Sequence, residues 1–147
     1  MKKTLFTLIF IAFSLICFAQ INAIDYESLN KTALNHLVSL INIDTAQPNP
    51  NEILAQRYIY KNLIDKKIDW RIFRMEKPRA NLIAVLKAHT PNPLEPLILI
   101  SHLDTAAIND NWQTPPTQAQ IKDNKIYGLG ASDAKNYAAI NLTILTW

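Results

Sequence analysis

Two polar side chains in the middle of the chain have the types and spacing of a small metal site. His102 and Asp104 are separated by one residue in the segment Ser-His-Leu-Asp-Thr (101–105), directly after the apolar run 97–100. Because side chains alternate along a strand, both would point to the same side, at the strand end where open α/β sheets place their sites. A carboxylate that orients one imidazole nitrogen leaves the other nitrogen as a lone pair for a metal. For this pair alone, a strand-end ion pair is the competing interpretation.

A third candidate, Asp133, follows the two glycines of the chain. Average usage predicts about ten glycines in a chain of this length, yet this one has only Gly128 and Gly130, inside Tyr-Gly-Leu-Gly-Ala-Ser-Asp (127–133). Two glycines around one residue allow a sharp bend, which would direct Asp133 toward His102. The competing interpretation is an ordinary hairpin exit whose polar residues only cap the next helix.

The periodicity of apolar residues predicts the elements that position these side chains. The run 97–100 is entirely apolar, which is typical of a strand buried on both faces, and we expect it at the centre of a sheet. Helices that alternate with buried strands indicate an α/β fold with helix, sheet and helix layers. The expected elements are helices at 26–43, after 51 as far as 65–67, and after 133 to 147, strands at 68–73, 81–88 and 97–100, and a hairpin at 118–127.

Several motifs follow one another in a fixed order: His102-Leu-Asp104-Thr105, Trp112, Pro115-Pro116, and Lys-Ile-Tyr-Gly-Leu-Gly-Ala-Ser-Asp-Ala-Lys at 125–135. This series resembles the zinc-dependent hydrolases that include acetylornithine deacetylase, succinyl-diaminopimelate desuccinylase, aminoacylase and glutamate carboxypeptidase. The loop 44–52 is similar to the loop after the first helix in that family. The resemblance implies that residues 24–147 are the N-terminal portion of a zinc-dependent exopeptidase-like catalytic domain.

The resemblance also implies a role for each matching polar residue. His102 would bind one zinc ion, and Asp133 would bridge two zinc ions with its two carboxylate oxygens. Asp104, the candidate catalytic residue, would hold His102 in place from the side away from the metal. The implied cofactor is a pair of Zn²⁺ ions, with Co²⁺ or Mn²⁺ as alternatives. Two such ions share a hydroxide and polarise an amide carbonyl.

Other matching positions have no ligand role. We assign Lys135 and Trp112 to packing or local ordering, and we expect the Asp133–Ala134 peptide bond to be cis, as is frequent in the family. The sequence departs from the family pattern at three positions, which are Ser101 in place of a glycine, Leu129 in place of an arginine and Asn136 in place of a glycine.

The implied function is hydrolysis of peptide or acyl-amide bonds, of carboxypeptidase, dipeptidase or deacylase type, with a small peptide or an N-acyl-amino acid as substrate. In the family the general-base glutamate and the later ligands lie C-terminal to the segment present here, so this chain is expected to be an inactive fragment. Two alternatives remain open at this stage. One is a noncatalytic binding module that keeps the scaffold, and the other is a metal-free interaction protein with an N-terminal membrane anchor.

Residues 1–23 have the pattern of a secretory signal peptide. Lys2 and Lys3 precede an apolar run of about 15 residues, shorter than the roughly 20 that cross a bilayer, and cleavage after Ala19 or Ala23 fits. The predicted location is therefore secreted or periplasmic, with membrane contact only through the signal peptide. The formal net charge is +3, with 15 basic and 12 acidic residues. Removal of the signal peptide takes away two lysines and no acid, so the composition gives no support to nucleic-acid binding.

Overall fold

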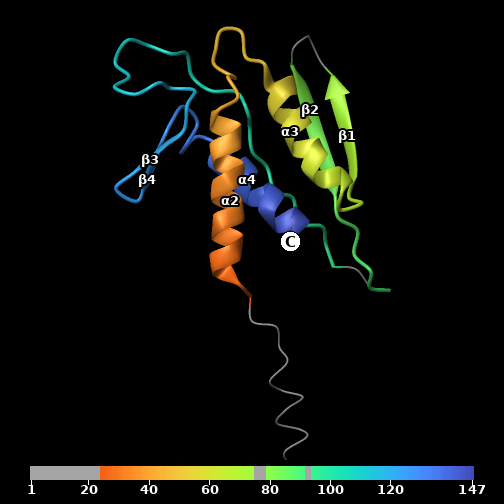
Figure 1. Cartoon of the computed structure of the whole chain (residues 1–147). Coiled ribbons are helices and arrows are strands. Elements are labelled where there is room, and N and C mark those ends of the chain that lie inside the picture. Colours follow the sequence, from red (N-terminus) through yellow and green to blue (C-terminus); the bar gives the residue numbers. More distant parts are fainter. Residues whose placement is uncertain (1–23, 75–78, 92–93) are drawn as a thin grey trace, which may run out of the picture.

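The computed structural model describes residues 24–74, 79–91 and 94–147. Within these residues it has three helices and two small antiparallel sheets (Figure 1). The α/β class expected from the sequence is confirmed at this coarse level. The elements are α2 (Tyr26–Ile41), α3 (Glu52–Ile64), β1 (Asp69–Arg74), β2 (Ala80–Val85), β3 (Gln120–Lys122), β4 (Lys125–Tyr127) and α4 (Lys135–Thr146).

Helix α2 forms because its first turn is capped and one face is apolar. The Asp25 side chain accepts a hydrogen bond of 3.0 Å from the backbone N–H of Ser28, which satisfies one free donor of the first turn. Leu40 and Ile41 are fully buried and pack in one cluster with Ala138 of α4. Burial of a leucine or isoleucine side chain contributes about 1.5–3 kcal/mol relative to exposure. The α2–α4 contact is therefore the main core of the structure.

A second core cluster joins α3, the β1–β2 sheet and the end of α4. Leu63, Ile68 and Leu142 form this cluster. Strands β1 and β2 pair antiparallel, with Ile72 opposite Leu82. In Figure 1 this sheet and α3 lie on one side of α2, the β3–β4 hairpin lies on the other side, and α4 contacts both α2 and α3. Helix α4 therefore connects the two clusters.

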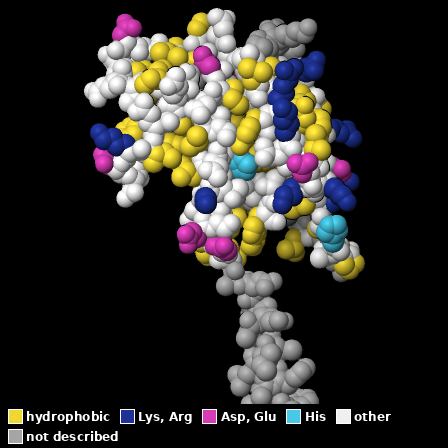
Figure 2. Space-filling model, in the orientation of Figure 1, with side chains coloured by type: hydrophobic (Ala, Val, Ile, Leu, Met, Phe, Trp, Pro, Cys, Tyr) yellow, Lys and Arg dark blue, Asp and Glu magenta, His cyan; other side chains and the backbone are white. Residues whose placement is uncertain are grey.

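The prediction that residues 97–100 form a buried central strand is wrong. Leu97, Ile98 and Ile100 are exposed, with 84%, 74% and 84% of their surface accessible, and no strand covers this run. An extended segment becomes a strand only where neighbouring backbone groups pair with it. The sheets of the described residues contain β1 to β4 alone, so the run lies outside them. Figure 2 shows hydrophobic side chains, in yellow, at several places on the visible surface.

The hairpin before α4 matches the sequence prediction. Strands β3 and β4 pair antiparallel, and Asp123 and Asn124 between them have φ values of 51° and 57°. Asn and Asp tolerate this left-handed backbone better than other non-glycine residues. The turn therefore forms where its sequence predicts it.

The predictions about the N-terminal segment and about a membrane anchor depend on which residues the structure describes. The predicted signal peptide at 1–23 lies outside the described residues. Within the described ranges, none of the helices has the length and apolarity required to cross a bilayer.

Candidate functional site

The segment that carries His102 is positioned by the loop between α2 and α3. Ala46 and Thr105 form an isolated parallel bridge, with Thr105 N–H donating to the Thr45 carbonyl and Gln47 N–H donating to the Thr105 carbonyl, both at 3.0 Å. The buried Thr45 hydroxyl donates to the Leu103 carbonyl at 2.6 Å. Residues 101–105 are therefore fixed by backbone pairing with this loop, although the expected strand before them is absent from the described sheets.

The glycine-containing bend delivers Asp133 to the same place. Gly130 has φ +86°, and a Cβ atom there would lie 2.8 Å from both Lys135 Cδ and Thr105 Cγ2. Gly128 has φ +154°, and its Cβ would clash with the Ile41 side chain. Both the backbone conformation and the lack of space thus require glycine. The bend packs directly on Thr105, which brings the start of α4 next to the His102 segment.

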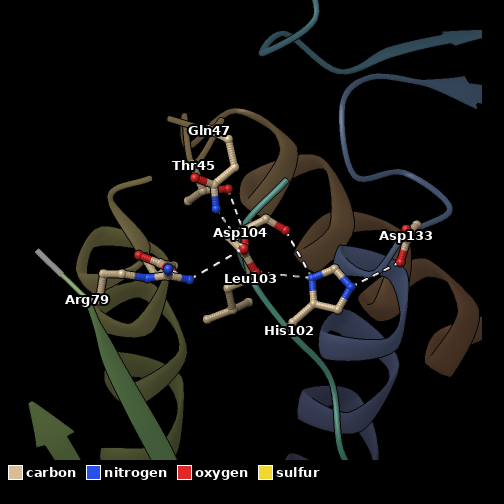
Figure 3. Close-up of polar contacts among 8 residues, drawn as sticks. Thr45, Gln47, Arg79, His102, Leu103, Asp104 and Asp133 are labelled. Atoms are coloured by element: carbon tan, nitrogen blue, oxygen red, sulfur yellow. Dashed lines mark hydrogen bonds and ion pairs between the residues drawn. The ribbon is translucent and has the colours of Figure 1, made fainter. Parts of the chain in front are cut away.

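The structure brings His102 and Asp133 together (Figure 3). Imidazole Nε2 of His102 lies 3.0 Å from Oδ1 of Asp133, and Nδ1 lies 3.0 Å from the backbone carbonyl oxygen of Asp104. Asp104 Oδ1 is also 3.4 Å from Nδ1. Since a carbonyl oxygen and a carboxylate oxygen only accept, Nδ1 and Nε2 are each the hydrogen-bond donor in their contact. Nε2 then faces the carboxylate of Asp133.

The partners of His102 set its charge. Partial burial alone would lower the pKa of His102, but the hydrogen bonds to the Asp104 carbonyl and the Asp133 carboxylate, and the charges of both residues, raise the pKa above its usual 6.5. Half of the His102 side chain and 85% of the Asp133 side chain are exposed. The two groups therefore meet at the surface, where a solute can reach them.

Asp104 is held on its other side by two further side chains (Figure 3). Its Oδ2 accepts from Gln47 Nε2 at 3.1 Å and from Arg79 Nη2 at 3.4 Å. Arg79 in turn contacts Oε1 of Glu52 at 2.9 Å through both Nε and Nη2. Gln47 lies in the loop before α3 and Arg79 precedes β2, so two separate parts of the chain contact the Asp104 carboxylate.

Comparison with known proteins gives two related groups of hydrolases. The chain is 35% identical over 108 residues to a probable succinyl-diaminopimelate desuccinylase of Staphylococcus aureus strain MRSA252, which covers 71% of this chain and 25% of that protein. It is 32% identical over 109 residues to an N-formyl-4-amino-5-aminomethyl-2-methylpyrimidine deformylase of Halalkalibacterium halodurans, which covers 67% of this chain and 25% of that protein. Over the matched region, the chain belongs to the amidohydrolase family of these proteins. The family expected from the motifs is thus confirmed.

This chain spans about a quarter of the length of the curated relatives it matches. A probable succinyl-diaminopimelate desuccinylase of Staphylococcus epidermidis strain RP62A has 32% identity over 101 residues, which is 67% of this chain and 24% of that protein. No family model matches the sequence. The relationship therefore concerns about a quarter of the length of these relatives.

The donor atoms of this amidohydrolase segment suit a zinc ion. An imidazole nitrogen and a carboxylate oxygen are common zinc ligands, with bonds of about 2.0–2.2 Å, so two donors on one tetrahedral ion lie roughly 3.3–3.5 Å apart. The 3.0 Å between His102 Nε2 and Asp133 Oδ1 is within a few tenths of an ångström of that spacing. Among the described residues, no group of three or more His, Cys, Asp or Glu side chains gathers around a common point.

Lys135 and the peptide bond after Asp133 lie at the start of α4. Lys135 is buried, and its ammonium group donates to the Ile43 carbonyl at 2.8 Å, which ties the start of α4 to the end of α2. Burial lowers the pKa of Lys135 to about 8, while the charge of Asp44 acts in the opposite direction. The Asp133–Ala134 peptide bond is cis, as the resemblance implies. Trp112 lines an open hollow together with Tyr127.

Sequence reasoning missed the residues that hold Asp104. Gln47 and Glu52 lie in the loop 44–52 that already resembles the family, so this similarity was an available signal. Arg79 gave no signal, because a single arginine before a strand is common on protein surfaces. Its role becomes visible only when its distances to Glu52 and Asp104 are known.

Proposed function

We propose that this chain carries part of the metal site of a hydrolase that cleaves an amide bond in a small N-acyl-amino acid, a peptide or a related compound. The observation that carries this proposal is the 3.0 Å contact between His102 Nε2 and Asp133 Oδ1. Family membership supports it, because the relatives are named for removal of a succinyl or a formyl group. The two residues come from segments that different parts of the chain hold rigidly.

The proposed roles follow from the contacts of each residue. Because the Asp104 carbonyl engages Nδ1, His102 would present the lone pair of Nε2 to a zinc ion once Nε2 has given up its proton. Asp133 presents a largely exposed carboxylate with two oxygens, which suits a ligand shared by two Zn²⁺ ions. Asp104 orients His102 without a ligand role of its own. Zinc, when bound, lowers the pKa of a water molecule from about 16 toward about 7 and polarises a carbonyl.

We also propose that this chain alone does not complete a catalytic site. Catalytic zinc takes about three protein ligands, and the residues assigned here supply His102 and Asp133. Secretion or export to the periplasm through residues 1–23 is a further part of the proposal. N-terminal sequencing of the protein from the culture medium or periplasm would detect a new terminus at Gln20 or Ile24, whereas a retained Met1 in membranes would favour the anchored interaction protein.

Calorimetric titration with Zn²⁺ tests the metal assignment directly. We expect the chain to bind zinc, and we expect His102→Ala and Asp133→Asn each to weaken binding by at least about tenfold, because each removes one of two donors. His89→Ala is the matched control, since His89 lies in an exposed turn. Equal zinc affinity in the parent and in His102→Ala would overturn the assignment. Circular dichroism of each variant would show that the fold is retained.

A further inference from the structure

A hollow beside the β3–β4 hairpin is separate from the arrangement around His102. Its lining side chains come from loop 109–114 and from the hairpin at 120–127. Its volume is about 580 Å³, and small-molecule sites typically have volumes of about 300–1,000 Å³. His102, Asp104 and Asp133 are not among the residues that line it. The hollow is therefore a surface feature that the proposed metal site does not use.

Hydrogen bonds of the backbone hold the loop that forms one wall of this hollow. The backbone N–H of Asn111 donates to Oδ1 of Asn109 at 3.0 Å, in a turn directly before Trp112. Further along, Leu129 N–H donates to the Pro116 carbonyl at 2.7 Å, which joins the loop to the chain just after β4. The hollow is thus largely formed before a ligand arrives, as is usual for small-molecule sites.

Two aromatic side chains line the hollow from opposite segments. Trp112 is partly buried, and Tyr127, the last residue of β4, is 41% exposed. Gln120 is the partner of Tyr127 in the β3–β4 register. Cross-strand partners lie on the same face, with Cβ atoms about 4.5–5.5 Å apart. The hollow therefore places a side-chain amide next to an aromatic ring, and aromatic rings offer apolar surface to a ligand.

Three exposed side-chain amides, of Asn111, Gln113 and Gln120, also line the hollow. An amide both donates and accepts hydrogen bonds. Within the part of the chain that the structure describes, none of these three amides bonds to another residue. The charged residues of the lining are Lys122 and Asp123, whose charges have opposite sign. The hollow thus offers free polar groups without a net charge.

We propose that this hollow binds a neutral saccharide, whose ring packs on Trp112 and Tyr127 and whose hydroxyl groups bond the amides of Asn111, Gln113 and Gln120. A sugar ring combines apolar C–H surface with hydroxyl groups that both donate and accept. The amides come from both the loop and the hairpin, which suits a ligand with polar groups around its whole rim. This binding goes beyond the proposed function and requires no zinc.

NMR titration of the metal-free, ¹⁵N-labelled chain tests the proposal. The probes are maltose, cellobiose and N,N′-diacetylchitobiose, each up to about 20 mM, which is enough to detect a Kd of about 1 mM. We expect at least one of them to shift the indole N–H signal of Trp112 in a saturable way. Trp70 is the internal control, because it stacks on Tyr60 in β1, on the other side of α2 from the hairpin (Figure 1). No saturable shift of Trp112 with any probe, or an equal shift of Trp70, would overturn the proposal.

Variants test the two kinds of contact. We expect Trp112→Ala to weaken binding at least about tenfold, because it removes the aromatic surface. Since Trp112 is partly buried, this variant could also disturb the loop. The double variant Gln113→Ala/Gln120→Ala changes only exposed side chains and should weaken binding at least about fivefold through two lost hydrogen bonds. Gln118→Ala, at an exposed position that does not line the hollow, is the matched control and should bind like the parent.

The double variant and two further measurements decide the ligand class. Equal affinity of the parent and the double variant, with native circular dichroism, would overturn the assignment of the amides. Addition of about 0.3 M NaCl should leave the affinity unchanged, because a neutral ligand forms no ion pair that salt can screen. A loss of about tenfold in salt would instead indicate a charged ligand. A Trp112 shift with uracil and with none of the disaccharides would mean that the rings stack a planar base, and would also overturn the proposal.

Discussion

Nε2 of His102 lies 3.0 Å from Oδ1 of Asp133, although 31 residues separate them in the chain. One side chain is fixed by the pairing of residues 103–105 with loop 45–47, and the other by a bend that packs on Thr105. Thr105 thus belongs to both arrangements. The convergence of an imidazole and a carboxylate is therefore the result of one compact junction, and changes at that junction should have measurable effects.

The bend at Gly130 should not accept a side chain. We expect Gly130→Ala to lower the free energy of unfolding by about 1–3 kcal/mol, because the residue has positive φ and the new Cβ would press on Lys135 and Thr105. Urea denaturation followed by circular dichroism measures this change. Ala107→Ser, at an exposed loop position, is the control and should alter stability by less than about 0.5 kcal/mol. Equal stability of Gly130→Ala and the parent would show that the bend is less constrained than its contacts indicate.

His36 should make stability depend on pH. Burial lowers the pKa of His36 below its usual 6.5, and its Nδ1 lies 2.7 Å from the hydroxyl of Tyr58. The unfolded chain therefore binds a proton more readily than the folded chain just below pH 6.5. The stabilisation is complete above the unfolded pKa and is lost as the pH falls through the folded pKa.

The variant His36→Gln tests this pH dependence. Urea denaturation of the metal-free protein at several pH values should show a smaller loss of stability below pH 6.5 in this variant than in the parent. His89→Gln is the matched control, because it makes the same substitution at an exposed position. Parallel profiles for His36→Gln and the parent would contradict the prediction.

Leu142 and Ile144 are two apolar residues of α4 with opposite surroundings. Leu142 is 2% exposed and packs with Leu63 and Ile68, whereas Ile144 is 54% exposed. We expect Leu142→Ala to cost about 2–5 kcal/mol through lost burial and a residual cavity. Ile144→Ala should cost less than about 1 kcal/mol. Thermal denaturation of the two variants compares them, and similar losses of stability would mean that the core of α4 is assigned to the wrong face.

Only part of the site was predictable from the residues. The apolar face of α2 and the hairpin that turns at Asp123 and Asn124 are local features, so the sequence predicted them correctly. The prediction of a buried strand at 97–100 was wrong, because an apolar segment does not reveal whether neighbouring strands are present to pair with it. The contacts of Arg79 were missed for a related reason. They join residues 25 and 27 positions apart, which come together through the packing of α3 against β2 and the pairing of residues 103–105 with the loop before α3.

The amino-acid sequence by itself determined the helices, the hairpin and the three candidate side chains His102, Asp104 and Asp133, because turn chemistry, periodicity and motif order are local properties of a chain. Only the tertiary structure decided that the imidazole and the Asp133 carboxylate face each other, and that Glu52 and Arg79 hold Asp104. The reason is physical: hydrogen bonds and ion pairs act over about 3 Å, and distances of that size between remote residues are set by how the elements pack.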